Sequence, residues 1–163
     1  MNRLYPVGIQ NFEKIRKDGY IYVDKTASLY QLVKTGQYYF LSRPRRFGKS
    51  LMISTLEAYF TGKRELFKGL EMERLEKDWT VHPVLHMDLN TRNYYDYESL
   101  VGILSQNLEE WEKLYGDEKK DRVPEERFMY VIKRACEKTG HKVVILIDEY
   151  DKPILQTISK PEL

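Results

Sequence analysis

The sequence contains a single cysteine, Cys136, among its 163 residues. One cysteine cannot form an internal disulfide, and the three histidines, His82, His86 and His141, do not have the spacing of a zinc-ligand cluster. We expect Cys136 to be a small core residue on a helix face and not a nucleophile. Since disulfides are rare in reducing compartments, we expect a cytoplasmic protein.

Long apolar runs and a strong excess of one charge are also lacking. No segment has the roughly 18 consecutive apolar residues of a membrane span, and the N-terminus lacks the apolar region of a signal peptide. The 27 basic and 25 acidic residues leave a formal net charge of +2, which gives no overall attraction for nucleic acid or an anionic membrane. We therefore expect a soluble protein with no membrane partner, and nucleic-acid binding is not indicated.

What the sequence does contain is an alternation of helical and extended patterns. Helices are expected over residues 11–17, 27–34, 49–60, 97–115 and 124–139, and strands over residues 20–23, 38–42, 83–89 and 142–148. Gly36 is expected at a helix end that favours a residue without Cβ. The last strand is a β-branched run of the kind that parallel sheets bury on both faces. This alternation predicts an α/β fold.

A candidate phosphate-binding loop follows the strand expected at 38–42. Such loops have a glycine, four free residues and then Gly-Lys-Ser or Gly-Lys-Thr, because backbone N–H groups wrap a phosphate while the lysine and hydroxyl reach phosphate oxygens and Mg²⁺. The candidate loop consists of Arg43, Pro44, Arg45, Arg46, Phe47, Gly48, Lys49, Ser50 and Leu51. Arg43 stands where the first glycine is expected, so the motif is degenerate. An ordinary helix start with a solvated lysine is the alternative interpretation.

A second motif favours the phosphate-loop interpretation. The apolar run 143–147 leads directly into Asp148 and Glu149, the form of a Walker B strand. Such an aspartate orders Mg²⁺, and the adjacent glutamate accepts a proton from the water that attacks the γ-phosphate. A turn or a helix cap would also explain two acidic residues after a strand. Their occurrence together with the loop predicts nucleotide binding.

With both motifs in view, the chain resembles the bacterial AAA-ATPase-like family, whose members often carry a PD-(D/E)XK nuclease-like domain after the ATPase part. The matching stretches are residues 5–9 with Phe12, 22–26, 40–50 and 144–151. The string Arg-Pro-Arg-Arg-Phe-Gly-Lys-Ser is specific to this family, so the missing glycine supports the assignment. The resemblance implies phosphate and magnesium roles for Gly48, Lys49 and Ser50, the Walker B role for Asp148 and the catalytic-base role for Glu149.

The resemblance covers the family's N-terminal part only. The chain ends at Leu163, which leaves too few residues for the further strand, carrying a polar sensor residue, that normally lies between the phosphate-loop strand and the Walker B strand. We therefore expect a P-loop NTPase-like, mostly parallel sheet with flanking helices that is incomplete at the C-terminus. Residues 1–37 are expected to be an extension packed on a partial core at 38–163. The nuclease-like domain belongs to longer family members, and no nuclease activity is expected here.

Three functions compete. The first is ATP binding and hydrolysis with Mg²⁺, in which Lys49 and Glu149 are catalytic and Ser50 and Asp148 hold the metal. The second is an ATP-dependent switch or interaction module with negligible turnover, because no sensor residue or arginine finger can be assigned. The third, nucleic-acid binding through the loop arginines, is weaker because phosphate contact explains them better. Self-association is open.

Other residues that attract attention have simpler interpretations. Tyr94, Tyr95 and Tyr97, beside Arg92, could stack on a base, but aromatic packing around a helix start is the expected role. Asp24 and Asp88 are carboxylates at strand ends, and capping of nearby backbone N–H groups is expected for both.

Overall fold

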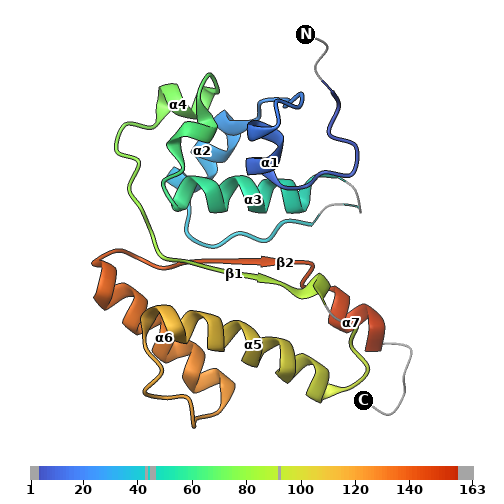
Figure 1. Ribbon diagram of the computed structural model, residues 1–163, viewed down its shortest axis with the longest axis vertical. Helices are drawn as coiled ribbons and strands as arrows, with labels where there is room; N and C mark the ends of the chain where they lie inside the picture. Colours follow the sequence, from blue (N-terminus) through green and yellow to red (C-terminus); the bar gives the residue numbers. More distant parts are fainter. Residues whose placement is uncertain (1–3, 43, 45–46, 92, 158–163) are drawn as a thin grey trace. The chain divides into compact units, whose positions relative to one another are not determined.

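The computed structural model describes residues 4–42, 44, 47–91 and 93–157, which form two compact units, one within residues 1–81 and one within residues 82–163. The first unit contains α1 (Phe12–Lys17), α2 (Thr26–Thr35), α3 (Lys49–Phe60), η1 (Arg64–Phe67) and α4 (Glu71–Leu75). The second contains β1 (Val84–Asp88), η2 (Leu89–Thr91), α5 (Tyr97–Tyr115), α6 (Pro124–Thr139), β2 (Val144–Asp148) and α7 (Lys152–Thr157) (Figure 1).

An aromatic cluster holds the first unit together. Phe12 of α1 and Phe67 of η1 are fully buried, with ring centroids 4.9 Å apart, and Trp79 lies 5.2 Å from Phe67. Tyr59 of α3 approaches both Phe67 and Trp79 edge-on. Buried aromatic side chains remove large apolar areas from water, so this cluster fixes α1 against α3.

Asp24 joins α2 to α4. Its carboxylate accepts hydrogen bonds from the Thr26 N–H (2.8 Å) and from the Glu71 N–H (2.8 Å), and the buried Thr26 hydroxyl oxygen accepts one from the Met72 N–H (3.0 Å). Burial acts to raise the pKa of Asp24, but the hydrogen bonds from Thr26 and Glu71 outweigh it and hold the pKa below its ordinary value. The expected capping role of Asp24 is thus confirmed.

A buried carboxylate, Glu76, organises the end of the first unit. It accepts hydrogen bonds from the Tyr59 hydroxyl and from the backbone N–H groups of Lys77 (2.9 Å) and Asp78 (3.0 Å), and it pairs with the Lys34 ammonium at 2.9 Å. Burial acts to raise the pKa of Glu76, but these partners lower it from 4.5 to about 2. The ionised form is therefore the one that the fold stabilises.

Replacing Glu76 with glutamine should lower the free energy of unfolding at pH 7 by about 1–3 kcal/mol, because buried partners of the carboxylate lose a charged acceptor. A lowered folded-state pKa contributes stability above the unfolded value of 4.5, and this contribution is lost as the pH falls toward about 2. Urea unfolding followed by Trp79 fluorescence in a Trp111→Phe background should show a smaller loss across that range for Glu76→Gln than for the parent protein. The exposed Glu65→Gln serves as the control.

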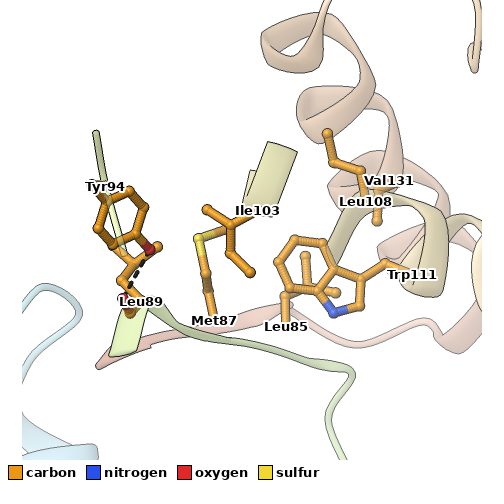
Figure 2. Close-up of a cluster of buried hydrophobic side chains, with 8 residues drawn as sticks. All are labelled: Leu85, Met87, Leu89, Tyr94, Ile103, Leu108, Trp111 and Val131. Atoms are coloured by element: carbon orange, nitrogen blue, oxygen red, sulfur yellow. Dashed lines mark hydrogen bonds between the residues drawn. The ribbon is translucent and has the colours of Figure 1, made fainter. Parts of the chain in front are cut away.

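The second unit is built on two parallel strands. β1 and β2 pair with Val84 opposite Val144 and Asp88 opposite Asp148. Figure 1 shows α5 and α6 together along one side of this pair. The core between strands and helices is a cluster of eight buried side chains drawn in Figure 2: Leu85, Met87, Leu89, Tyr94, Ile103, Leu108, Trp111 and Val131.

Local signals set the helix ends of this unit. Asp96 caps α5 by accepting a hydrogen bond from the Ser99 N–H (2.7 Å), and the Ser99 hydroxyl oxygen accepts one from the Asp96 N–H (3.1 Å). Pro124 opens α6, where its missing N–H costs nothing, and Gly140 ends it with a φ of +69°. Both ends of α6 agree with the expectation from the sequence.

Two expected strands are not strands in the structure. Residues 38–42 do not belong to the sheet, and Tyr38 and Phe40 are 87% and 75% exposed. Residues 20–23 are also outside the sheet, and the Ile21 N–H donates to the Leu4 carbonyl instead (2.9 Å). A strand needs a neighbour for its backbone groups, and the described residues contain one two-stranded sheet, β1–β2. The expected larger parallel sheet is therefore observed only as this pair.

Two further expectations need correction. β2 is not buried on both faces, because Ile145 and Ile147 are 42% and 45% exposed, as fits a strand of a two-stranded sheet. Cys136 is exposed on α6 and is not a core residue. Gly36 is the C-cap of α2, as expected, in an extended conformation, and a Cβ there would lie 2.3 Å from the Tyr39 hydroxyl oxygen. That hydroxyl donates to the Leu32 carbonyl (2.5 Å).

Candidate functional site

The candidate phosphate site is centred on the start of α3. Gly48 precedes the helix with a φ of +76°, a conformation that glycine adopts without strain, and no side chain caps the helix N-terminus. The Gly48 carbonyl accepts the first helical hydrogen bond from the Met52 N–H (3.0 Å). Lys49 and Ser50 are half-buried at the first two helical positions. An uncapped helix start of this kind directs N–H groups and positive dipole toward an anion.

The rest of the first unit supports this helix start. The Ser54 hydroxyl oxygen accepts a hydrogen bond from the Phe12 N–H (2.9 Å), which ties α1 to α3 one turn beyond the candidate site. The Thr55 hydroxyl donates to the Leu51 carbonyl (2.8 Å). Of the loop before α3, Pro44 and Phe47 are exposed, whereas Arg43, Arg45 and Arg46 lie outside the described residues. Of the positions expected to contact phosphate, Lys49, Ser50 and Leu51 therefore lie in the first turn of a helix that packs against α1.

The second half of the candidate site is the end of β2. Asp148, the last strand residue, is 7% exposed, and its Oδ1 accepts a hydrogen bond from the Glu149 N–H (2.9 Å). Its register partner on β1 is Asp88. Ligands of open parallel sheets bind beyond the carboxyl ends of the strands, which is where both aspartates lie. A signal for this pair was present in the sequence, because Asp148 is the last residue of one expected strand and Asp88 is the second-last residue of the other.

Glu149 has an unusual backbone conformation. Its φ is +52°, in the left-handed region that costs a residue with a Cβ roughly 1–2 kcal/mol. The Glu149 carbonyl accepts a hydrogen bond from the Lys152 N–H (3.0 Å), which begins the turn into α7. Strained residues of this kind cluster at functional sites, and here the strained residue is the expected catalytic base.

Replacing Glu149 with glycine should give a more stable protein than replacing it with alanine, by about 1 kcal/mol. Both substitutions remove the carboxylate, but only glycine relieves the left-handed backbone. Urea unfolding of the two variants in a Trp79→Phe background, followed by Trp111 fluorescence, measures the difference. Equal stabilities, or a more stable alanine variant, would show that the backbone at 149 is not strained in solution.

The remaining candidates are placed as follows. Asp88 caps the turn after β1 by accepting from the Asn90 N–H (2.8 Å), as expected. Tyr94 is buried and its hydroxyl donates to the Leu89 carbonyl (2.8 Å), whereas Tyr95 and Tyr97 are 62% and 68% exposed and do not fill the expected packing role.

The histidines are not all isolated from one another. His82 and His141 lie with ring centroids 5.6 Å apart, and His82 Nδ1 is 2.9 Å from the Lys142 carbonyl oxygen. Sequence spacing could not reveal this contact, because 58 residues lie between the two histidines in the chain. Within the described residues, no group of three or more His, Cys, Asp or Glu side chains could hold a metal ion. None of the described helices is long and apolar enough to span a membrane.

The structure thus describes each half of the candidate site by itself. Gly48 to Leu51 belong to the first unit, and Asp148 and Glu149 belong to the second. The roles of these residues stay predictions at this point. Their local geometries, an uncapped helix start and a carboxylate pair after a parallel strand, are of the kinds that bind phosphate and a hard cation.

Comparison with known proteins places the chain in context. Residues 6–163 match the model of the AAA-ATPase-like family, described as predicted AAA-ATPase. The chain is 44% identical over 160 residues to an uncharacterized protein in the vnfD 5′ region of Azotobacter chroococcum mcd 1. That alignment covers 97% of this chain and 31% of the relative, so the chain spans about a third of the relative's length. No solved structure matches.

Proposed function

Because the chain belongs to the AAA-ATPase-like family, we propose that it binds ATP with Mg²⁺ and hydrolyses the nucleotide. In this proposal residues 43–51 form a variant Walker A loop, and Asp148 and Glu149 form the Walker B pair. The observation that carries the proposal is the start of α3, where Gly48 is left-handed, no side chain caps the helix and Lys49 is the first helical residue.

That helix start offers donors for phosphate. The first N–H groups of a helix have no intrahelical partner, so they can donate to phosphate oxygens. The Lys49 ammonium adds a charge-assisted hydrogen bond to the β- or γ-phosphate. Phe47 and Pro44, both exposed, flank this point, and Arg43, Arg45 and Arg46 add positive charge to the loop by sequence. We assign the loop to the phosphates on these grounds.

The donor chemistry fits magnesium. The Ser50 hydroxyl and the Asp148 carboxylate offer hard oxygen ligands, which Mg²⁺ prefers, and Mg²⁺ commonly takes only one or two protein ligands besides phosphate and water. When bound, the ion neutralises charge on the phosphate oxygens. The Glu149 N–H donates to Oδ1 of the Asp148 carboxylate and so orients it. In this proposal Oδ2 is the atom that would contact the ion or its water.

Glu149 follows directly and supplies the base. Its carboxylate accepts a proton from the water that attacks the γ-phosphate, in the role of a general base. The half-buried position of Glu149 and its left-handed backbone direct the side chain differently from that of a strand residue. A strained conformation retained at this position is what a functional requirement on the carboxylate would produce.

A nucleotide-dependent switch with negligible turnover is the second candidate. It shares the binding residues but not the catalytic step. The observation that favours it is the two-stranded sheet, which contains no third strand among the described residues to carry a sensor residue. Phosphate release under saturating ATP separates the two candidates, because only hydrolysis produces a rate that depends on Glu149.

Asp148→Asn should weaken ATP binding about tenfold or more in the presence of Mg²⁺ and have little effect without it, because the carboxylate acts through the ion. Titration of a fluorescent ATP analogue, with MgCl₂ or with EDTA, tests this expectation. The exposed Asp117→Asn in the same unit is the control. An equal loss of affinity with and without the metal would contradict a Walker B role for Asp148.

A further inference from the structure

A cavity of about 350 Å³ lies between β1 and α5 in the second unit. β1 contributes Asp88, and α5 contributes Ile103, Gln106, Asn107 and Glu110, whose spacing of three and four places them on one stripe of the helix. A volume of this size lies at the lower end of the range for small-molecule sites. The expected nucleotide-binding residues are not among those that line it.

The cavity wall offers mainly hydrogen-bond acceptors. Asp88 and Glu110 are carboxylates, of which Asp88 Oδ1 accepts a hydrogen bond from the Asn90 N–H (2.8 Å). Asn107 uses one of its two Nδ2 hydrogens on the Ile103 carbonyl (2.8 Å), and its side-chain oxygen is an acceptor. The hydroxyl of Thr91, also in the wall, donates to the Asp88 carbonyl (3.2 Å). A ligand with several hydrogen-bond donors matches the carboxylate and amide oxygens of this wall.

The charge of the wall has one sign. The described residues that line the cavity include two carboxylates and no lysine or arginine, and His86 is the one lining residue that can become cationic. The ammonium of Lys152 donates a hydrogen bond to the Asn90 carbonyl (2.7 Å), and Lys152 does not line the cavity. Two carboxylates in a partly enclosed polar space favour a cation over a neutral ligand.

We propose that this cavity binds a guanidinium group, either of free arginine or of an arginine side chain in a peptide. A guanidinium has five donors in a plane, which suits two carboxylates with amide oxygens beside them better than the three donors of an ammonium do. A guanidinium is also more weakly hydrated than an ammonium. It therefore loses less hydration free energy when it contacts the apolar side chain of Ile103, which is 3% exposed. None of the residues proposed to bind the nucleotide lines the cavity, although Asp88 of its wall is the register partner of Asp148.

The side-chain amides of Gln106 and Asn107 allow a direct test, because their NH₂ signals in NMR spectra report on the cavity wall. Titration with L-arginine should shift these signals, whereas L-citrulline, which has the same shape without the charge, should shift them far less. An arginine-containing tripeptide with blocked ends separates the sources. Binding of the free amino acid alone, of the tripeptide alone or of both supports the site and identifies its ligand. Absence of shifts with both overturns the proposal.

Two matched variants on α5 test whether Glu110 contacts the bound arginine. Glu110→Gln should weaken L-arginine binding about tenfold, because a charge-assisted contact is lost, whereas Glu109→Gln, which removes the same charge beside the cavity, should weaken it less than about twofold. Glu110 is exposed, so its replacement is not expected to unfold the unit. Equal effects of the two variants, or equal affinities for arginine and citrulline, would overturn the proposal. ATP binding by Glu110→Gln should be unchanged, so either proposal can fail alone.

Discussion

Lys49→Ala should reduce ATP affinity by about a hundredfold or more while leaving the first unit folded, because in the proposed site the ammonium makes a charge-assisted contact with phosphate. The surroundings of Lys49 indicate that its replacement would not unfold the first unit. Lys49 is the first residue of α3 and is half-buried, and within the described residues no hydrogen bond or ion pair is found for its ammonium. Its removal therefore leaves no buried partner unsatisfied.

The measurement is a titration with a fluorescent ATP analogue in the presence of Mg²⁺, with circular dichroism to confirm that the variant is folded. Lys68→Ala is a matched control, because Lys68 is an exposed lysine in the same unit and its side chain has no assigned role. Undiminished affinity in folded Lys49→Ala would contradict the phosphate-loop interpretation. A loss shared by Lys68→Ala would indicate a nonspecific charge effect.

Glu149→Gln should reduce the rate of phosphate release by about 10²- to 10⁴-fold while ATP binding is retained, because the amide cannot accept the proton from water. Glutamine is preferred to glycine for this purpose, since both glutamate and glutamine carry a Cβ and impose the same strain at the left-handed position. The backbone at the end of β2 is therefore unchanged in the comparison. Only the chemistry of the side chain differs.

Phosphate release should be measured under saturating ATP, with Asp117→Asn as a control for charge in the same unit. A rate in Glu149→Gln equal to that of the parent protein would contradict the role of Glu149 as base. If neither protein releases phosphate above background but both bind ATP, the switch candidate is correct and hydrolysis is not a property of this chain. Binding and turnover are thus tested separately.

The elements that could be predicted from the sequence are those whose signals are local. The apolar stripe of α5 predicted residues 97–115, and the structure has the helix at these positions. The β-branched run before Asp148 predicted β2 because it is apolar and short. Pro124 and Gly140 marked the ends of α6 through their backbone preferences.

The failures depend on neighbours that are distant in sequence. Residues 38–42 have strand-like composition, but whether a strand forms depends on a partner for its backbone, which composition does not reveal. The bidentate pair between Arg127 of α6 and Glu112 of α5, with contacts of 2.8 and 2.7 Å, was not foreseen because both residues look like ordinary surface charges. Glu76 was missed for the same reason.

The candidate site shows the same division. Gly48, Lys49, Ser50, Asp148 and Glu149 were identified from motifs, which are local patterns. The left-handed backbone of Glu149 and the cavity beside β1 had no sequence signal, because each arises from how the chain turns or packs. The alignment of Asp88 with Asp148 could have been inferred only by assuming that their strands pair in parallel.

The central claim is that Gly48 to Leu51 and Asp148 act on one nucleotide. Backbone NMR of the 19.5 kDa chain, titrated with a non-hydrolysable ATP analogue and Mg²⁺, tests it most directly. We predict that the amide signals of residues 48–51 and of 148–149 shift together, with one shared dissociation constant. Shifts confined to one group, different dissociation constants for the two groups, or no shift in either group would contradict the claim.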